Sequence, residues 1–285
     1  MVVDFHTHVF PPEVRVQREE YLRRDPTFRE LYSDPRSKLA GAEEVLASMD
    51  RSGVQVSVIV GFAWGEMDLC RRTNDYILEA AAGSGGRLVP FCTLQPRVGE
   101  EARSEVKRCA AAGARGLGEL RPQSQGFDLA PESDEGALLG WASSAYDLPL
   151  LFHVTEPVGH RYAGKGGLEL APLYRFIESF PGVTVVAAHW GGGLPFYALM
   201  PEVKEALSST FFDTAATPLL YDPAIYRRAA DLVGADRILF ASDFPLLPQE
   251  RCLAQVRKAG LNDEEMRLVL GENARRLLRL PDDRA

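Results

Sequence analysis

Short hydrophobic runs rich in Val, Ile, Leu and Phe recur along the chain, and a segment with helical periodicity follows each run. This alternation is typical of a parallel α/β fold, because each strand needs a crossover helix before the next parallel strand can begin. The runs that we predict to be strands cover residues 2–8, 55–62, 88–94, 114–120, 149–154, 184–190, 210–215 and 238–244.

Eight such units in 285 residues predict a (β/α)8 TIM barrel of the α/β class, with residues 1–285 as a single domain. No GxGxxG motif follows the first run, which disfavours a dinucleotide-binding sheet. The barrel is expected to be distorted, because residues 9–41 form a long insertion after the first strand. We interpret this insertion as a partly helical cap over the barrel mouth, with a solvated surface excursion as the alternative.

Composition narrows the classes of partner and compartment. The net charge of −8 and the pI near 5.3 argue against nucleic acid as the main partner, since phosphate binding needs a concentrated basic surface. We find no signal peptide and no membrane-spanning run, and the four scattered cysteines fit reduced, buried thiols. We therefore expect a cytoplasmic protein with a small anionic substrate, no nucleic-acid or membrane partner, and a homodimer as one option for its assembly.

Titratable side chains gather where the predicted strands end. Barrel enzymes carry their catalytic groups at this end of the strands. Four of the five histidines lie there together with two carboxylates: His6, His8, Glu119, His153, His189 and Asp243. A lone histidine in an apolar strand is usually a core residue, but converging imidazoles and carboxylates make sense if a cation offsets their burial. We predict a divalent metal, Zn²⁺ first and Mn²⁺ or Fe²⁺ as alternatives, with one ion or two.

These residues resemble the amidohydrolase superfamily of metal-dependent barrels, which combines HxH on strand 1, His on strands 5 and 6, and Asp on strand 8. The stretches HTHVFPPE, AHWGGG, SDFPLL and ENARRLL make the chain similar to the amidohydrolase-related subgroup that includes aminocarboxymuconate semialdehyde decarboxylase. The resemblance implies that His6, His8, His153 and Asp243 hold the metal. It also implies that His189 acts as a base or polarises the substrate, and that Asp243 accepts a proton from the metal-bound water.

Strand 4 departs from the superfamily pattern, because Glu119 stands where two-metal members often carry a carboxylated lysine. Glu119 could be a metal ligand that bridges a second ion held by His153 and His189, or it could orient the substrate and the ligands. We expect direct or near-direct metal involvement. The structural alternative is a buried ion pair with Arg121 or Arg115.

Residues 155–167, which follow strand 5, should lie over the barrel mouth as its βα loop. We expect the following residues of this loop to recognise an anionic substrate: Glu156, His160, Arg161, Tyr162 and Lys165. The alternative is that they are solvated loop residues. Trp190, which precedes three glycines after strand 6, is predicted to form a pocket wall.

The main functional prediction is a metal-dependent hydrolase that uses a metal-activated water on an amide, lactone or ester of a small anionic substrate. The alternative is a metal-dependent non-oxidative decarboxylase of a small carboxylic acid, since the same ligands serve both reactions. A metal-binding barrel without catalysis is disfavoured, because neither a ligand nor a base is missing from the pattern.

Overall fold

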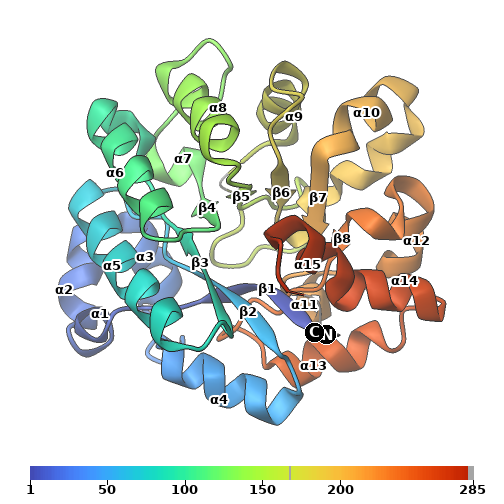
Figure 1. The fold of residues 1–285 in the computed structure, drawn as a ribbon, viewed down its shortest axis with the longest axis horizontal. Coiled ribbons are helices and arrows are strands. Elements are labelled where there is room, and N and C mark those ends of the chain that lie inside the picture. Colours follow the sequence, from blue (N-terminus) through green and yellow to red (C-terminus); the bar gives the residue numbers. More distant parts are fainter. Residues whose placement is uncertain (167, 282–285) are drawn as a thin grey trace.

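A computed structural model describes residues 1–166 and 168–281, so Gly167 of the predicted loop and residues 282–285 of the predicted domain lie outside it. Eight parallel strands follow one another in chain order around a barrel, as Figure 1 shows. They are β1 (Val3–His8), β2 (Val56–Val60), β3 (Leu88–Cys92), β4 (Gly116–Leu120), β5 (Leu150–Phe152), β6 (Val185–Ala187), β7 (Thr210–Asp213) and β8 (Ile238–Leu239). The predicted (β/α)8 barrel is confirmed.

Helices surround the strands, and each of the larger ones turns an apolar face toward the barrel. After the insertion they are α4 (Ala42–Ser52), α5 (Met67–Gly83), α6 (Glu100–Ala111), α7 (Pro122–Gln125), α8 (Asp134–Tyr146), α9 (Leu170–Ser179), α10 (Pro201–Ala206), α11 (Thr217–Leu220), α12 (Ala224–Val233), α13 (Gln249–Val256), α14 (Asp263–Arg267) and α15 (Asn273–Leu278). A capping box begins α14: the Asn262 side chain accepts from the Glu265 N–H, and the Glu265 carboxylate accepts from the Asn262 N–H, both at 2.9 Å. No helix in the described part of the chain is both long and apolar enough to span a bilayer.

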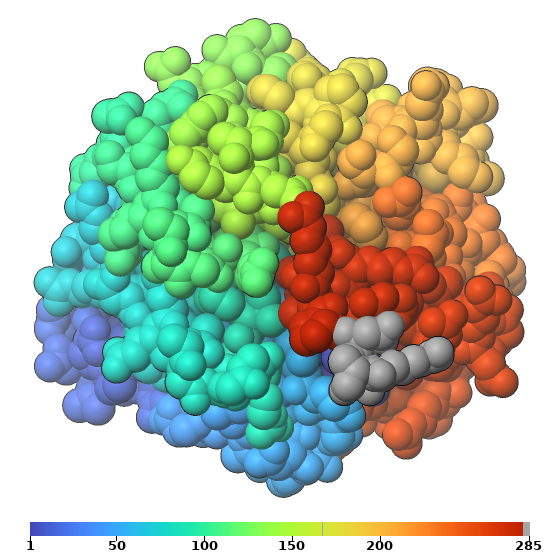
Figure 2. Space-filling model, viewed as in Figure 1, coloured from blue at the N-terminus to red at the C-terminus, as the bar shows by residue number. Residues whose placement is uncertain are grey.

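The barrel closes where the chain beyond β8 meets β1. The Phe5 N–H donates to the Phe240 carbonyl at 2.8 Å, and the Asp243 N–H donates to the His6 carbonyl at 3.0 Å. Figures 1 and 2 show α15, in red, near the centre of the face turned to the viewer. There Ala274 and Leu278 of α15 belong to the same apolar cluster as the inward side chains of the strands. The catalytic candidates must therefore lie at the opposite end.

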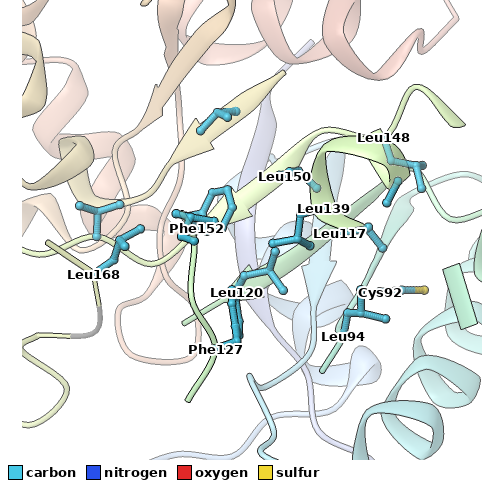
Figure 3. Packing of buried hydrophobic residues seen from close by; sticks show 14 of the residues in the cluster. Cys92, Leu94, Leu117, Leu120, Phe127, Leu139, Leu148, Leu150, Phe152 and Leu168 are labelled. Atoms are coloured by element: carbon cyan, nitrogen blue, oxygen red, sulfur yellow. The ribbon is translucent and has the colours of Figure 1, made fainter. Parts of the chain in front are cut away.

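Two apolar layers fix the direction of side chains on the strands. Figure 3 shows Leu150 and Phe152 of β5 among the side chains that pack between the barrel and its helices, near Leu139 of α8. Leu151, between them, belongs instead to the cluster shared by strands from around the whole barrel, which is the barrel interior. Because successive side chains alternate, His153 points inward like Leu151.

The insertion after β1 contains three short helices: α1 (Pro12–Val16), α2 (Arg18–Arg24) and α3 (Pro26–Tyr32). Asp25 begins α3 by accepting from the Phe28 N–H at 2.8 Å, and Pro26 takes the first helical position. The Phe28 ring packs on Phe62 and Trp64, which follow β2, with centroids 5.4 and 5.1 Å away. This aromatic contact attaches the insertion to the barrel.

Candidate metal centre

Six side chains converge beyond the carboxyl ends of the strands, and they are the six that the sequence singled out. Two overlapping groups each have ligand atoms within 4.8 Å of one another: His6, His8 and Glu119, and Glu119, His153 and His189. The Asp243 carboxylate completes the cluster, 3.4 Å from His8 Nε2. His8 is partly exposed and the others are at most 8% exposed. Their individual roles as ligands stay predictions.

The strands themselves are shorter than the predicted runs. His153 directly follows β5, His189 lies two residues after β6, and Asp243 lies four residues after β8. His189 and Asp243 reach the cluster through left-handed backbone conformations, with φ of 55° and 66°. Turns as well as strands therefore aim these side chains.

Asp213, the last residue of β7, orients two of the histidines and was not predicted as a site residue from the sequence. Its Oδ2 accepts from His6 Nδ1 at 2.9 Å, and its Oδ1 accepts from the backbone N–H of His189 at 2.9 Å. The His189 ring donates from Nδ1 to the Ala215 carbonyl at 3.1 Å. Both rings thus turn Nε2 toward the cluster, as metal-binding histidines do when a hydrogen bond fixes the outer nitrogen. The only sequence signal was a carboxylate at a strand end.

The His153 ring has the opposite orientation to the rings of His6 and His189: its Nδ1, rather than its Nε2, lies toward the cluster. A carbonyl can only accept, so the contact of 3.1 Å to the Gly164 oxygen requires a proton on His153 Nε2. Burial, and then the positive charge of Arg121, lower the pKa of His153 to about 4, which leaves the ring neutral. Its unprotonated Nδ1 then lies 2.8 Å from Glu119 Oε1. Two such electron-rich atoms need a cation beside them, and this geometry fits a metal ion.

The charges of the cluster lead to the same conclusion. Burial lowers the pKa of His6, but the Asp213 carboxylate outweighs it and raises that pKa to about 10. Burial likewise opposes a charge on His189, whereas hydrogen bonding to Glu119 and the charge of Asp243 raise its pKa to about 9. Burial raises the pKa of Glu119, but the neighbouring imidazoles lower it by more. The pKa of Glu119 therefore lies well below its usual value. The ionised carboxylates therefore stabilise positive charge within the cluster, either as protons on the imidazoles or as a divalent ion.

A cavity of about 440 Å³ opens beside the cluster. His8, Glu119, His153, His189 and Asp243 contribute to its lining. Most of the rest is apolar or aromatic and comes from the insertion and from the loops after β2, β7 and β8: Leu31, Tyr32, Phe62, Leu219, Leu220 and Leu246. The cavity can therefore hold a small molecule with a flat apolar body against the proposed metal ligands.

The loop after β5 only partly matches the prediction. His160 and Tyr162 line the cavity, whereas Glu156, Arg161 and Lys165 do not. Arg161 is exposed; Lys165 Nζ donates to the loop carbonyls of Val158 and His160, and Glu156 accepts from the Tyr162 hydroxyl at 3.0 Å. The loop thus uses two of these charges to hold its own shape. Lys38 and Arg121, which were not predicted to bind the substrate, line the cavity instead.

Trp190 is not a pocket wall, and this prediction is wrong. Its indole is fully buried, donates to Thr217 Oγ1 at 2.9 Å and packs edge-on against Tyr226 of α12, with ring centroids 4.9 Å apart. The backbone takes φ values of 55–94° from Trp190 to Gly193, which turns the indole away from the cavity toward the helices. The glycines are needed for this turn, because a Cβ at Gly192 would lie 2.5 Å from the Thr155 carbonyl oxygen.

Glu119 does not form the arginine ion pair that was its structural alternative. Its carboxylate contacts His153 at 2.8 Å and lies 3.7–3.8 Å from nitrogens of His6, His8 and His189. In the described residues neither Arg115 nor Arg121 forms an ion pair with it. The position of Glu119 in both potential ligand groups keeps direct metal contact as the preferred interpretation.

The proteins to which this chain is similar include named decarboxylases. A γ-resorcylate decarboxylase of Polaromonas sp. (strain JS666 / ATCC BAA-500) is 21% identical over 288 residues, covering 84% of each chain. The 5-carboxyvanillate decarboxylase of Sphingomonas paucimobilis has a similar structure, with a TM-score of 0.82, 20% identity and coverage of 98% of this chain and 99% of that one. The enzyme of that name from Novosphingobium aromaticivorans (TM-score 0.81, 17% identity, 98% and 96% coverage) was solved with manganese and 4-hydroxy-3-methoxy-5-nitrobenzoic acid.

These comparisons overturn the main functional prediction. The similar proteins with named activities are decarboxylases rather than hydrolases. Manganese, rather than zinc, is the metal bound in some of the similar structures. The predicted superfamily, by contrast, is confirmed: the family model described as Amidohydrolase matches residues 3–280. The chain belongs to the amidohydrolase family.

Proposed function

We propose that this protein is a metal-dependent non-oxidative decarboxylase of a small aromatic carboxylic acid. One observation carries the proposal: a buried cluster of four imidazoles and two carboxylates lies beside a cavity with apolar and aromatic walls. The activities of the similar proteins support the reaction, and the manganese and benzoic acid bound to one of them support the class of metal and ligand.

The donors expected to hold the ion are His6, His8, His153 and Asp243, with Glu119 beside them. Imidazole and carboxylate donors suit Mn²⁺ and also Zn²⁺, and the similar structures favour Mn²⁺. The bound ion would supply positive charge that holds and polarises the anionic oxygens of the substrate.

The residues of this chain bind the ring of the substrate and transfer the proton. Tyr32, Phe62 and Leu246 provide apolar surface for the ring and keep water from its faces. His189, or Asp243 after it has taken up a proton from water, delivers that proton to the ring carbon that bears the carboxylate; both residues line the cavity. The bond from that carbon to the carboxylate then breaks, its electron pair stays with the ring, and CO₂ leaves. One proton has replaced one carboxylate, so no oxidant is needed.

The test combines metal analysis with product analysis. Elemental analysis of the wild type purified without added metal should find one or two ions per chain, and His6→Ala should reduce that content. The Mn²⁺-loaded wild type should release CO₂ from 2,6-dihydroxybenzoate, 5-carboxyvanillate or another hydroxylated benzoate of a panel. The exposed-site variant Asp231→Asn on α12 serves as the control. Absence of CO₂ release across the panel from the metal-loaded protein would overturn the proposal.

A further inference from the structure

We propose that Arg121 binds the carboxylate that the substrate loses, an inference that rests on the proposed function. Arg121 follows β4 directly and stands two residues after Glu119, at the end of the barrel where the cluster lies. It lines the cavity although only 5% of its surface is exposed. No sequence motif pointed to this role.

The guanidinium has few partners for a buried cation. Its Nη2 donates to the Gly164 carbonyl at 3.0 Å, while its Nε is buried without a hydrogen-bond partner. Arg121 forms no ion pair with a carboxylate in the part of the chain that the structure describes. A buried charge is costly unless it is paired, so the site is incomplete without an anion. A carboxylate fits best, because its two oxygens match the fork of N–H groups that arginine presents.

The position of Arg121 places this anion beside the metal centre. The Gly164 carbonyl accepts from both Arg121 Nη2 and His153 Nε2, at 3.0 and 3.1 Å, so the guanidinium and the imidazole are neighbours. Gly164 is itself fixed, because its N–H donates to Glu30 of α3 at 3.0 Å. A ring in the cavity can therefore direct its carboxylate to Arg121 while its neighbouring oxygens approach the cluster.

The other cation at the cavity is less suited to this role. Lys38, which follows α3 in the insertion, is exposed and can keep its hydration. An anion stabilises Arg121 more than it stabilises Lys38, because burial has already removed the water that would hydrate the guanidinium. The consequence is selectivity: the acid pairs with Arg121, and the decarboxylated product leaves because it has lost the paired group.

The experiment compares each acid with its decarboxylated counterpart, using 2,6-dihydroxybenzoate with resorcinol and salicylate with phenol. Isothermal titration calorimetry on Mn²⁺-loaded protein measures the dissociation constants. Arg121→Gln should weaken binding of the acids roughly 10- to 100-fold, by loss of a charge-assisted bidentate contact. It should change binding of the phenols less than about twofold. Arg121→Lys should recover part of the acid affinity, because a lysine keeps the charge but not the fork.

Arg115→Gln is the matched control, because Arg115 is exposed at the opposite end of β4. Circular dichroism and metal content check that each variant is folded and loaded. Equal weakening of acid and phenol by Arg121→Gln would show that Arg121 only positions the Gly164 loop, and would overturn the proposal. Unchanged acid binding, or a wild type that does not prefer acids to phenols, would overturn it as well.

The outcomes also separate this inference from the proposed function. CO₂ release by a wild type whose acid binding does not depend on Arg121 would refute the inference alone. Arginine-dependent binding of acids by a protein that releases no CO₂ would refute the proposed function alone.

Discussion

The strand ends and the loop after β5 contain similar residue types, but the sequence predicts them unequally well. Around the barrel, all six predicted side chains meet in one cluster. In the loop of residues 155–166, only His160 and Tyr162 of the five predicted residues line the cavity. Side chains along a strand alternate between its two faces, apart from local register shifts such as those in β1 and β4. A loop has no such period, so its residues show which chemistry is available but not which side chain faces the substrate.

The largest effect is expected from Asp243→Asn, in the cluster at the strand ends. We expect turnover to fall by at least about 10³-fold, because the variant removes a carboxylate from the ligands and from the groups that move the proton. The fold should persist, since Asn tolerates the left-handed conformation with φ of 66° that Asp243 adopts. The measurement is kcat, together with metal content and thermal unfolding. Retained activity would remove Asp243 from the catalytic cluster.

The next largest effect is expected from substitution of Trp190, and it concerns stability rather than substrate binding. Trp190→Ala should lower the free energy of unfolding by about 3–5 kcal/mol, because the indole is fully buried against Tyr226. Denaturant unfolding measures this loss, with the partly exposed Trp141→Ala on α8 as the milder control. If Trp190 were a pocket wall after all, the folded variant would lose affinity for the acid with little loss of stability.

The eight strands could be predicted because hydrophobic runs and helical segments alternate along the whole chain. His6, His8, Glu119 and His153 could be placed because they lie near or directly after the end of a predicted strand. Alternation from Leu151 aims His153, whereas the strand register shifts between Asp4 and Thr7 and between Leu117 and Leu120. Trp190 could not, because the left-handed turn after β6 reverses its direction. Asp213 and Arg121 were missed for another reason: each matters through partners that are distant in sequence, His6 and the Gly164 carbonyl.

Asp213→Asn tests how far the strand ends depend on such partners. The Asn oxygen can still accept from the His189 N–H, but its NH₂ group would then face His6 and favour the ring form with the proton on Nε2. That proton would occupy the position of a metal. We expect the metal dissociation constant to rise roughly 10- to 100-fold. Competition with a chelator measures it, against Asp231→Asn. Unchanged affinity would show that Asp213 has no influence on the ligands.

The smallest effects should come from the loop charges. Arg161→Ala should change kcat/KM less than about twofold, because Arg161 is exposed and outside the cavity lining. Lys165→Ala should act slightly more strongly, since Lys165 holds the carbonyls of Val158 and His160. Steady-state kinetics on an accepted acid checks both, with Tyr162→Phe as the comparison from the cavity lining. A tenfold loss in Arg161→Ala would mean that the loop closes over bound substrate and brings this arginine into the cavity. The strand ends and the loop would then differ in mobility rather than in function.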